Sequence, residues 1–153
     1  MGTSNKKKDL TIDELSNHLV SYAVDRDDIK EILKLLPEEK YLDHSTIDYE
    51  LQILKIVTVG WCISYCMENT DQKLQVSEVY WNLINAFSKN ISEIVSLQTG
   101  KTVDYFEIVK NRFDIYLSSL NDLTAKDDPV NAIGPSFANN CKMNGEVFTI
   151  MAG

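Results

Sequence analysis

Apolar side chains return at every third or fourth position along most of this chain, and this spacing limits what it can fold into. The clearest stripe is Val76, Tyr80, Leu83, Phe87, Ile91 and Ile94. Residues with this spacing lie on one face of an α-helix, whereas a half-buried strand needs strict alternation of apolar and polar residues. Because only 6 Gly and 3 Pro interrupt the pattern, the chain is expected to form long helices.

Capping residues and helix breakers predict where individual helices begin and end. Thr11 and Glu14 have the spacing of a capping box, which predicts the start of the first helix. Acidic residues at 25–28 predict a second start, and Pro37 is expected to end that helix because it lacks an amide hydrogen. Gly100 is well placed to end the long fourth helix in the left-handed conformation.

The third predicted helix, about residues 46–67, is expected to lie at the centre of the fold. Residues 56–67 are apolar almost all round, and a helix without a polar face is normally surrounded by others. Gly60 costs about 1 kcal/mol of helix propensity relative to Ala, which indicates that another backbone approaches closely there. The predicted fold class is therefore all-α, an irregular bundle of five to six helices around this apolar helix.

The last part of the chain, residues 136–153, allows two structures. Asn144 and Gly145 before residues 147–150 have the form of a turn that leads into a short C-terminal β-hairpin. The alternative is a helix that begins at Pro135, which is preferred because an isolated hairpin is only marginally stable. One face of that helix would consist of Ala138, Cys141, Gly145, Phe148 and Ala152. Residues 124–135 lose periodicity and are expected to form a loop with at most one short turn.

Length and composition indicate a polar tail followed by one domain. The chain of 153 residues has the common size of a single domain, so residues 1–9 are expected to be a flexible tail and 10–153 a single helical domain. We find no secretory pattern and no apolar run that would span a bilayer. The protein is therefore expected to be cytoplasmic, with no membrane partner.

The charge of the chain restricts the partners it can bind. Fifteen basic and 23 acidic residues give a net charge of −8 at pH 7, which repels phosphate backbones, so no nucleic-acid partner is expected. An acidic helical module could instead neutralise a basic protein, as an immunity protein or antitoxin does.

The sequence shows no group of residues that predicts catalysis or metal binding. Phosphate-binding glycine loops, zinc-protease motifs and nucleophile motifs do not occur. Cys62 and Cys66 are one helical turn apart, but few further ligands are present for zinc, so both cysteines are expected to pack in the core. Neither His18 nor His44 follows an acid by three residues, as a di-iron site would require. No catalytic residue, metal or cofactor is predicted.

One helix side carries a candidate ligand site. Tyr105, Arg112 and Tyr116 share a side of the fifth predicted helix, where the planar fork of Arg and two hydroxyl groups could bind an anionic small molecule. This predicts, as a competing function, a small-ligand sensor or an enzyme with a pocket between helices.

The preferred function is a non-enzymatic helical binding or interaction module that associates with itself through the C-terminal helix. Ala138, Gly145 and Ala152 lie two heptads end to end, and small side chains permit close helix approach. Cys141 and Phe148 fill the positions between them. Two arrangements would cover this stripe: the helix packs in its own core, which is favoured for the stripe taken alone, or two copies meet in a symmetric homodimer. The identity of any other protein partner does not follow from the sequence.

Overall fold

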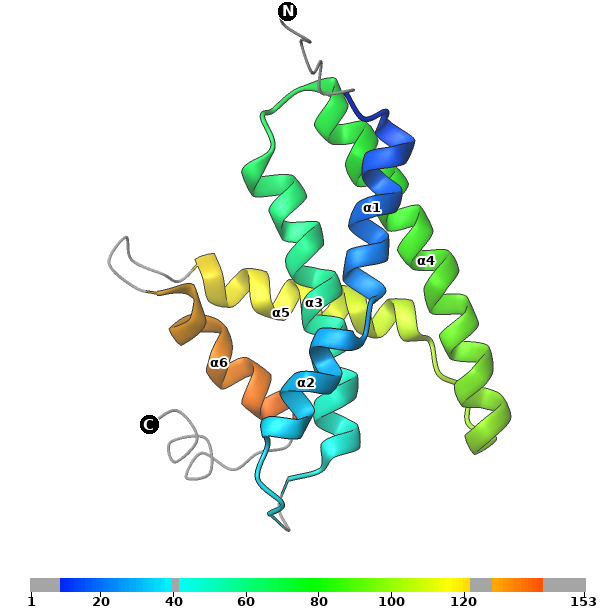
Figure 1. Ribbon diagram of the computed structural model, residues 1–153, viewed down its shortest axis with the longest axis vertical. Coiled ribbons are helices and arrows are strands. Elements are labelled where there is room, and N and C mark those ends of the chain that lie inside the picture. The colour runs from blue at the N-terminus through cyan, green and yellow to red at the C-terminus, as the bar shows by residue number, and fades with distance from the viewer. Residues whose placement is uncertain (1–8, 40–41, 122–127, 142–153) are drawn as a thin grey trace, which may run out of the picture.

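The computed structural model describes residues 9–39, 42–121 and 128–141. Helices account for 82% of these residues, which contain no strand, so the predicted all-helical class is confirmed for this part of the chain. Figure 1 shows α1 (Ile12–Val24), α2 (Asp27–Leu35), α3 (His44–Cys66), α4 (Asp71–Thr99), α5 (Tyr105–Asn121) and α6 (Pro129–Asn140). The predicted division into a tail and one domain stays a prediction, since residues 1–8 lie outside the described residues.

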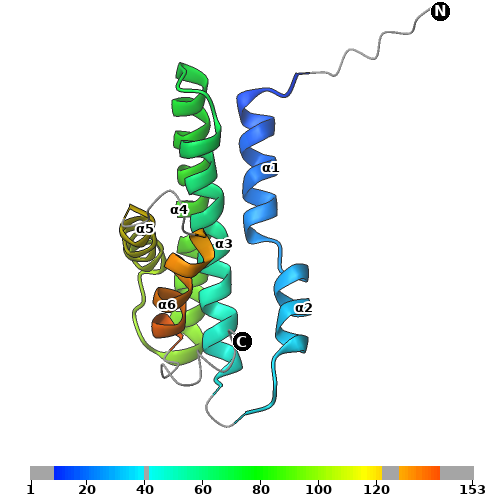
Figure 2. The ribbon, with the colours of Figure 1, turned by 90° about the vertical axis from the view of Figure 1, so that its left-hand side faces the viewer.

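The helices are arranged in layers on either side of α3. Figure 2 shows α1 and α2 on one side of it and α5 and α6 on the other. The long helix α4 packs against α1, α3 and α5, and α3 contacts each of the other described helices. Each functional surface considered below is therefore built partly on α3.

The predicted helix starts and stops agree with the hydrogen bonds at the helix ends. Thr11 Oγ1 accepts a bond from the Glu14 amide at 3.1 Å, and Glu14 Oε2 accepts one from the Thr11 amide at 3.0 Å. Asp43 caps α3 by accepting from the amide of Ser45 at 3.0 Å. Gly100 ends α4 at φ 69°, the left-handed region that favours glycine, as predicted.

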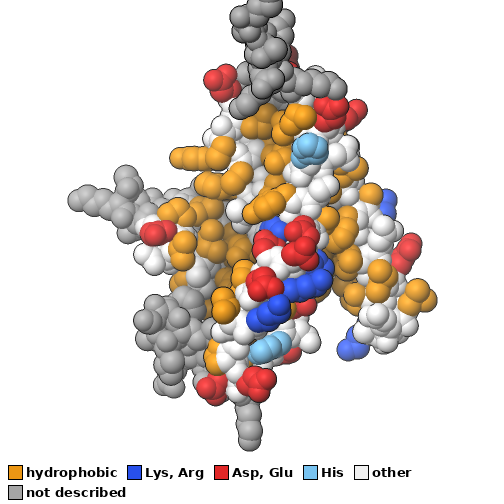
Figure 3. Space-filling view, viewed as in Figure 1, with side chains coloured by type: hydrophobic (Ala, Val, Ile, Leu, Met, Phe, Trp, Pro, Cys, Tyr) orange, Lys and Arg blue, Asp and Glu red, His pale blue; other side chains and the backbone are white. Residues whose placement is uncertain are grey.

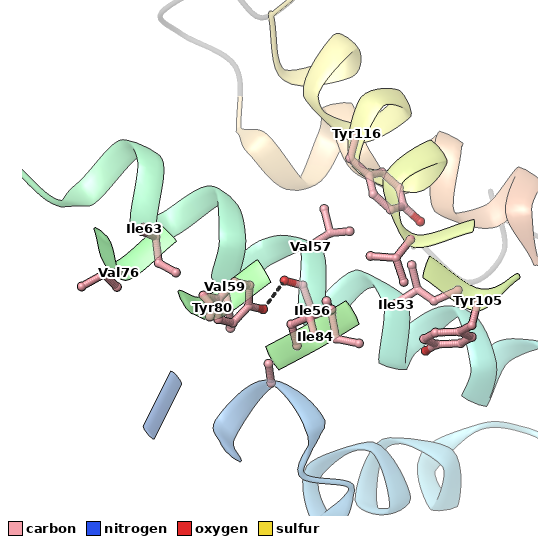
Figure 4. Packing of buried hydrophobic residues seen from close by; sticks show 12 residues of the cluster. Ile53, Ile56, Val57, Val59, Ile63, Val76, Tyr80, Ile84, Tyr105 and Tyr116 are labelled. Atoms are coloured by element: carbon pink, nitrogen blue, oxygen red, sulfur yellow. Dashed lines mark hydrogen bonds between the residues drawn. The ribbon is translucent and has the colours of Figure 1, made fainter. Parts of the chain in front are cut away.

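The main core lies where α1, α4 and α5 meet α3. Ile53, Ile56 and Ile63 of α3 are at most 3% exposed, and burying each such side chain contributes about 1.5–3 kcal/mol. They pack against a cluster drawn from the other helices, which includes Ala23, Val76, Tyr80, Ile84, Tyr105, Val109 and Tyr116. The hydroxyl of Tyr80 donates a hydrogen bond to the carbonyl oxygen of Ile56 at 2.7 Å, as Figure 4 shows, so this buried polar group is satisfied.

The predicted apolar central helix is not confirmed in the form expected. In the last turn of α3, Ser64, Tyr65 and Cys66 are exposed, so other helices do not surround this end. The buried face instead contains two polar residues, Glu50 and Gln52. The close approach at Gly60 comes from a side chain and not from a backbone, because the indole ring of Trp81 occupies the space of a Cβ there.

The predicted loop at residues 124–135 is wrong over its second half, because α6 already begins at Pro129. Asp128 caps the helix, with its Oδ1 accepting from the Val130 amide at 3.0 Å. Sequence reasoning placed the helix start at Pro135, but Pro129 follows the capping carboxylate and occupies the first helical position, where a missing amide hydrogen costs nothing. The helix ends at Asn140, and the alternative hairpin at residues 144–150 lies outside the described residues.

Candidate functional site

Arg112, a predicted ligand-binding residue, is already paired within the chain. Its Nε and Nη2 donate to Oε2 and Oε1 of Glu50 at 3.0 and 2.8 Å, and its Nη1 donates to Asn111 at 3.0 Å. The Glu50 side chain is 3% exposed and that of Arg112 is 21% exposed. The Glu50 carboxylate raises the pKa of Arg112, so the ion pair persists at neutral pH. The planar fork expected for an anionic ligand is occupied by Glu50.

The two tyrosines of the predicted ligand site line different hollows. Tyr116 is 1% exposed, and its hydroxyl accepts a hydrogen bond from Nδ2 of Asn140 at 3.1 Å, which ties α5 to α6. Burial raises the pKa of Tyr116 to about 12. Tyr105 is 2% exposed and packs edge-on against Tyr49. The structure therefore does not bring Tyr105, Arg112 and Tyr116 together around one cavity.

A hollow of about 140 Å³ that Tyr116 lines opens between α3, α5 and α6. We call it the apolar hollow, and its lining residues are Leu54, Val57, Thr58, Trp61, Phe113, Tyr116, Leu117, Leu120, Pro129 and Ile133. None of these side chains carries a charge. Figure 3 shows apolar side chains gathered over this side of the molecule, at the left of the view.

Aromatic and aliphatic side chains project beside the apolar hollow. The ring of Trp61 stacks on that of Tyr65 with 4.8 Å between centroids and 12° between planes. Tyr65 is 74% exposed, and Val130, which follows the lining residue Pro129, is 71% exposed. We call Tyr65 and Val130 the projecting pair. The apolar hollow and the projecting pair thus lie side by side on one face of the molecule.

Tyr105 lines a second hollow of about 320 Å³ near the start of α3, which we call the tyrosine pocket. Its lining residues are Val24, Arg26, Ser45, Asp48, Tyr49, Gln52, Phe87, Ile91 and Tyr105. It shares no residue with the apolar hollow. Polar and aromatic groups meet here from α3, α4, α5 and the link before α2, whereas the apolar hollow offers almost no polar group.

The described part of the predicted self-association stripe is covered by the chain itself. Ala138 and Cys141 are each 4% exposed, and Cys141 packs in a small cluster with Leu42 and Ile47. These two residues therefore face inward, which corresponds to the alternative of packing in the chain's own core. The other three members, Gly145, Phe148 and Ala152, lie outside the described residues.

The cysteines of α3 are less buried than predicted. Cys62 is half-buried and Cys66 is exposed, so the expected core position of Cys66 is wrong. Cys66 shares the last turn of α3 with Ser64 and Tyr65, which are also exposed. Burial raises the pKa of Cys62, and the neighbouring Cys66 adds to this effect. Among the described residues no three His, Cys, Asp or Glu side chains are grouped to hold a metal ion.

Sequence reasoning missed the buried polar partners of α3. Glu50 binds Arg112, 62 residues away in the chain, and Gln52 donates to the carbonyl oxygen of Ala23 at 2.7 Å. One signal for Glu50 was present, because this acid occupies the helical stripe that continues through Ile53 and Val57. A carboxylate on a buried stripe needs a partner, but the spacing of residues does not identify it.

No helix in the described ranges combines the length and the apolar character needed to cross a membrane. Comparison with protein-family profiles, with characterised proteins and with solved structures finds no match to this chain.

Proposed function

We propose that this chain is a non-enzymatic interaction module that associates with itself, with the apolar hollow and the projecting pair as the contact surface. The observation that carries this proposal is the uncharged hollow beside Tyr65 and Val130, which are 74% and 71% exposed. Contiguous apolar surface of this kind on a soluble domain is typical of a binding site, whereas single exposed apolar residues are common and need no explanation.

A second copy of the chain suits this surface because its projecting and receding parts lie on the same face. In a symmetric dimer the same patch on both copies meets, so a projection on each copy must find a recess on the other. The apolar hollow of about 140 Å³ is large enough for one aromatic ring, since an apolar cavity of about 150 Å³ binds benzene. Tyr65 supplies such a ring.

The charge of the chain favours the same face. Each copy carries −8, so two copies repel each other unless they meet through a region of low charge. The lining of the apolar hollow contains no charged residue. Water released from both apolar surfaces then favours association without the cost of burying unpaired charges.

This proposal keeps the C-terminal helix in the interface but assigns a different face to it. Pro129 and Ile133 of α6 line the apolar hollow, and Val130 projects beside it. Ala138, further along α6, is covered by its own chain. Contact would therefore involve the first turns of α6.

Sedimentation velocity at several protein concentrations tests the proposal. The wild-type chain is expected to form dimers as concentration rises, and Val130→Asp and Tyr65→Ser are expected to remain monomeric. Leu97→Asp on α4 is the matched control, because Leu97 is 88% exposed and lines neither the apolar hollow nor the tyrosine pocket. A wild-type chain that stays monomeric throughout, or a Leu97→Asp variant that loses dimers equally, contradicts this assignment.

Neutralisation of a basic partner has less support. On α2 acidic and basic side chains alternate, with ion pairs Asp27 to Lys30 at 3.9 Å and Glu31 to Lys34 at 2.7 Å. Figure 3 shows red and blue side chains next to one another over this helix. The acidic residues of α2 are thus partly neutralised within the chain, and the immunity-like or antitoxin-like function stays a prediction from net charge.

A further inference from the structure

The hydroxyl of Tyr105 distinguishes the tyrosine pocket from an ordinary surface depression. The two other deeply buried tyrosines are satisfied: Tyr80 donates to Ile56 at 2.7 Å, and Tyr116 accepts from Asn140 at 3.1 Å. Tyr105 is 2% exposed, yet its hydroxyl makes no hydrogen bond with any other described residue. Buried hydroxyl groups normally have a partner, and the described part of the chain leaves this one available to water or to a bound molecule.

The Tyr105 oxygen is open to the pocket and is not sealed in the core. Ser16 Oγ is the one side-chain polar atom among the described residues that is both fully enclosed and without a hydrogen bond. The unpartnered Tyr105 oxygen therefore retains some accessible surface. Because Tyr105 lines the tyrosine pocket, a molecule that enters the pocket can reach this hydroxyl.

The position of Tyr105 is fixed by its neighbours. Its ring makes edge contacts with Tyr49 at 5.5 Å and with Phe87 at 6.3 Å between centroids. Its backbone amide donates to Ser92 Oγ at 3.0 Å, which anchors the first residue of α5. A group held in place before binding loses little freedom when the ligand arrives, and this favours affinity.

Tyr105 is a hydrogen-bond donor at neutral pH. Burial raises the pKa of its hydroxyl, and the nearby hydroxyl of Tyr49 and the carboxylates of Glu50 and Asp48 add to this effect against the opposing charge of Arg26. A protonated phenol can donate to a neutral acceptor such as a carbonyl oxygen or a ring nitrogen.

The charged groups of the pocket compensate each other. Arg26 forms an ion pair with Asp48, and its Nη1 donates to Gln52 Oε1 at 3.0 Å. Gln52 in turn donates to the carbonyl oxygen of Ala23 at 2.7 Å. A charged ligand would have to separate the pair of Arg26 and Asp48, whereas a neutral one leaves it intact.

We propose that the tyrosine pocket binds a small neutral molecule with a ring or aliphatic body and a hydrogen-bond acceptor that receives the proton of Tyr105. The body packs against Phe87 and Ile91, and the mouth offers further hydroxyl groups from Ser45 and Tyr49. The volume of about 320 Å³ is at the lower end of the range of about 300–1,000 Å³ for ligand pockets, so the molecule is small. This site does not depend on self-association.

Benzamide, a neutral ring with a carbonyl acceptor, and toluene, a similar ring without one, are the probes that test the proposal. Backbone NMR shifts of the wild-type chain are expected to place benzamide at Gln52, Phe87 and Ile91. Tyr105→Phe, which removes only the hydroxyl, is expected to weaken benzamide binding about fivefold, the effect of one hydrogen bond. Toluene binding is expected not to weaken. Tyr116→Phe, a matched change in the other hollow, should bind benzamide as the wild type does.

Two outcomes overturn the proposal. The first is equal benzamide affinity of the wild type and Tyr105→Phe, and the second is the absence of shifts in the pocket at millimolar benzamide, which means that solvent alone fills it. If Tyr105→Phe does not fold, Ile91→Trp provides a second test, because the larger side chain takes up space in the pocket while Tyr105 itself is unchanged. Benzamide must then lose its shifts at Gln52 and Phe87, and their persistence also counts against the site.

Discussion

The two halves of α3 are buried in different ways. Residues 44–55 bury Glu50 and Gln52, each held by a side chain or carbonyl from another part of the chain. Residues 56–66 bury apolar side chains such as Ile56 and Ile63, and among the described contacts their one inter-helix side-chain hydrogen bond comes from Tyr80. The first half also buries Ile47 and Ile53, so it combines apolar packing with specific polar pairs, whereas the second half depends on apolar packing.

Because of this difference, the same helix can stabilise the fold and also contribute residues to two distinct hollows. Apolar packing tolerates small rearrangements because it has no fixed direction, whereas a bidentate ion pair requires one orientation. The first half contributes Asp48 and Gln52 to the tyrosine pocket, where both contact Arg26 from the link before α2. Most of the α3 residues that line the apolar hollow, Val57, Thr58 and Trp61, belong to the second half.

The largest effect is expected from breaking the polar half of α3. Arg112→Leu leaves the Glu50 carboxylate, 3% exposed, without a partner and should lower the free energy of unfolding by about 3 kcal/mol. Lys110→Leu is the control on the same helix, since Lys110 pairs with Glu107 at the exposed surface, and it should change stability little. Urea denaturation measures both. Equal effects of the two variants would show that Glu50 does not need Arg112.

A smaller effect is expected from overfilling the apolar half. The Cβ of Gly60→Ala would collide with the indole ring of Trp81, and overpacking costs about 1–3 kcal/mol, of which the better helix propensity of Ala recovers up to about 1 kcal/mol. Denaturation of Gly60→Ala, Trp81→Leu and the double variant tests this. The added methyl should destabilise the wild type and be tolerated once Leu replaces Trp81. If the effects of the two substitutions on stability simply add in the double variant, the predicted contact between residue 60 and Trp81 is contradicted.

The helices were predictable from the sequence because their signals are local. The capping box at Thr11 and Glu14 and the left-handed Gly100 involve residues within one or two turns of each other. The start of α6 was missed because two prolines compete for the first helical position and only the capping bond of Asp128 decides between them. Choosing Pro135 instead placed the helix six residues too late.

The sites were much less predictable, because they depend on long-range pairs. Arg112 was identified as a candidate for an anionic ligand, but Glu50, its partner on another helix, already occupies that role. Tyr105 and Tyr116 were predicted to share one ligand site, but they line two different hollows, and the spacing along α5 does not show this difference. Whether a tyrosine hydroxyl of α5 finds a partner within the chain depends on how α3 and α6 pack against α5. The spacing of apolar residues along one helix does not predict that packing.

Alkaline pH should weaken the contact between α6 and the first half of α3. Burial raises the pKa of the Cys141 thiol from its ordinary 9.0 to about 12. Between these values the unfolded chain releases this proton while the folded chain keeps it, so stability falls as pH rises, by about 1.4 kcal/mol for each pH unit. Cys141→Ala should flatten the dependence of the unfolding midpoint on pH above 9. Cys66→Ala, at an exposed thiol, should leave the slope unchanged.

The smallest expected effect is a difference in stability between variants of two similarly buried tyrosines. Tyr80→Phe removes the hydrogen bond to Ile56 and should cost about 1 kcal/mol. Tyr105→Phe removes a hydroxyl that has no partner in the described chain, so no internal bond is lost and stability should stay the same or rise slightly. Thermal denaturation of both variants without added ligand measures the difference. If Tyr105→Phe is destabilised as much as Tyr80→Phe, the hydroxyl of Tyr105 stabilises the fold. The proposal that this hydroxyl binds a ligand in the tyrosine pocket would then lose its main support.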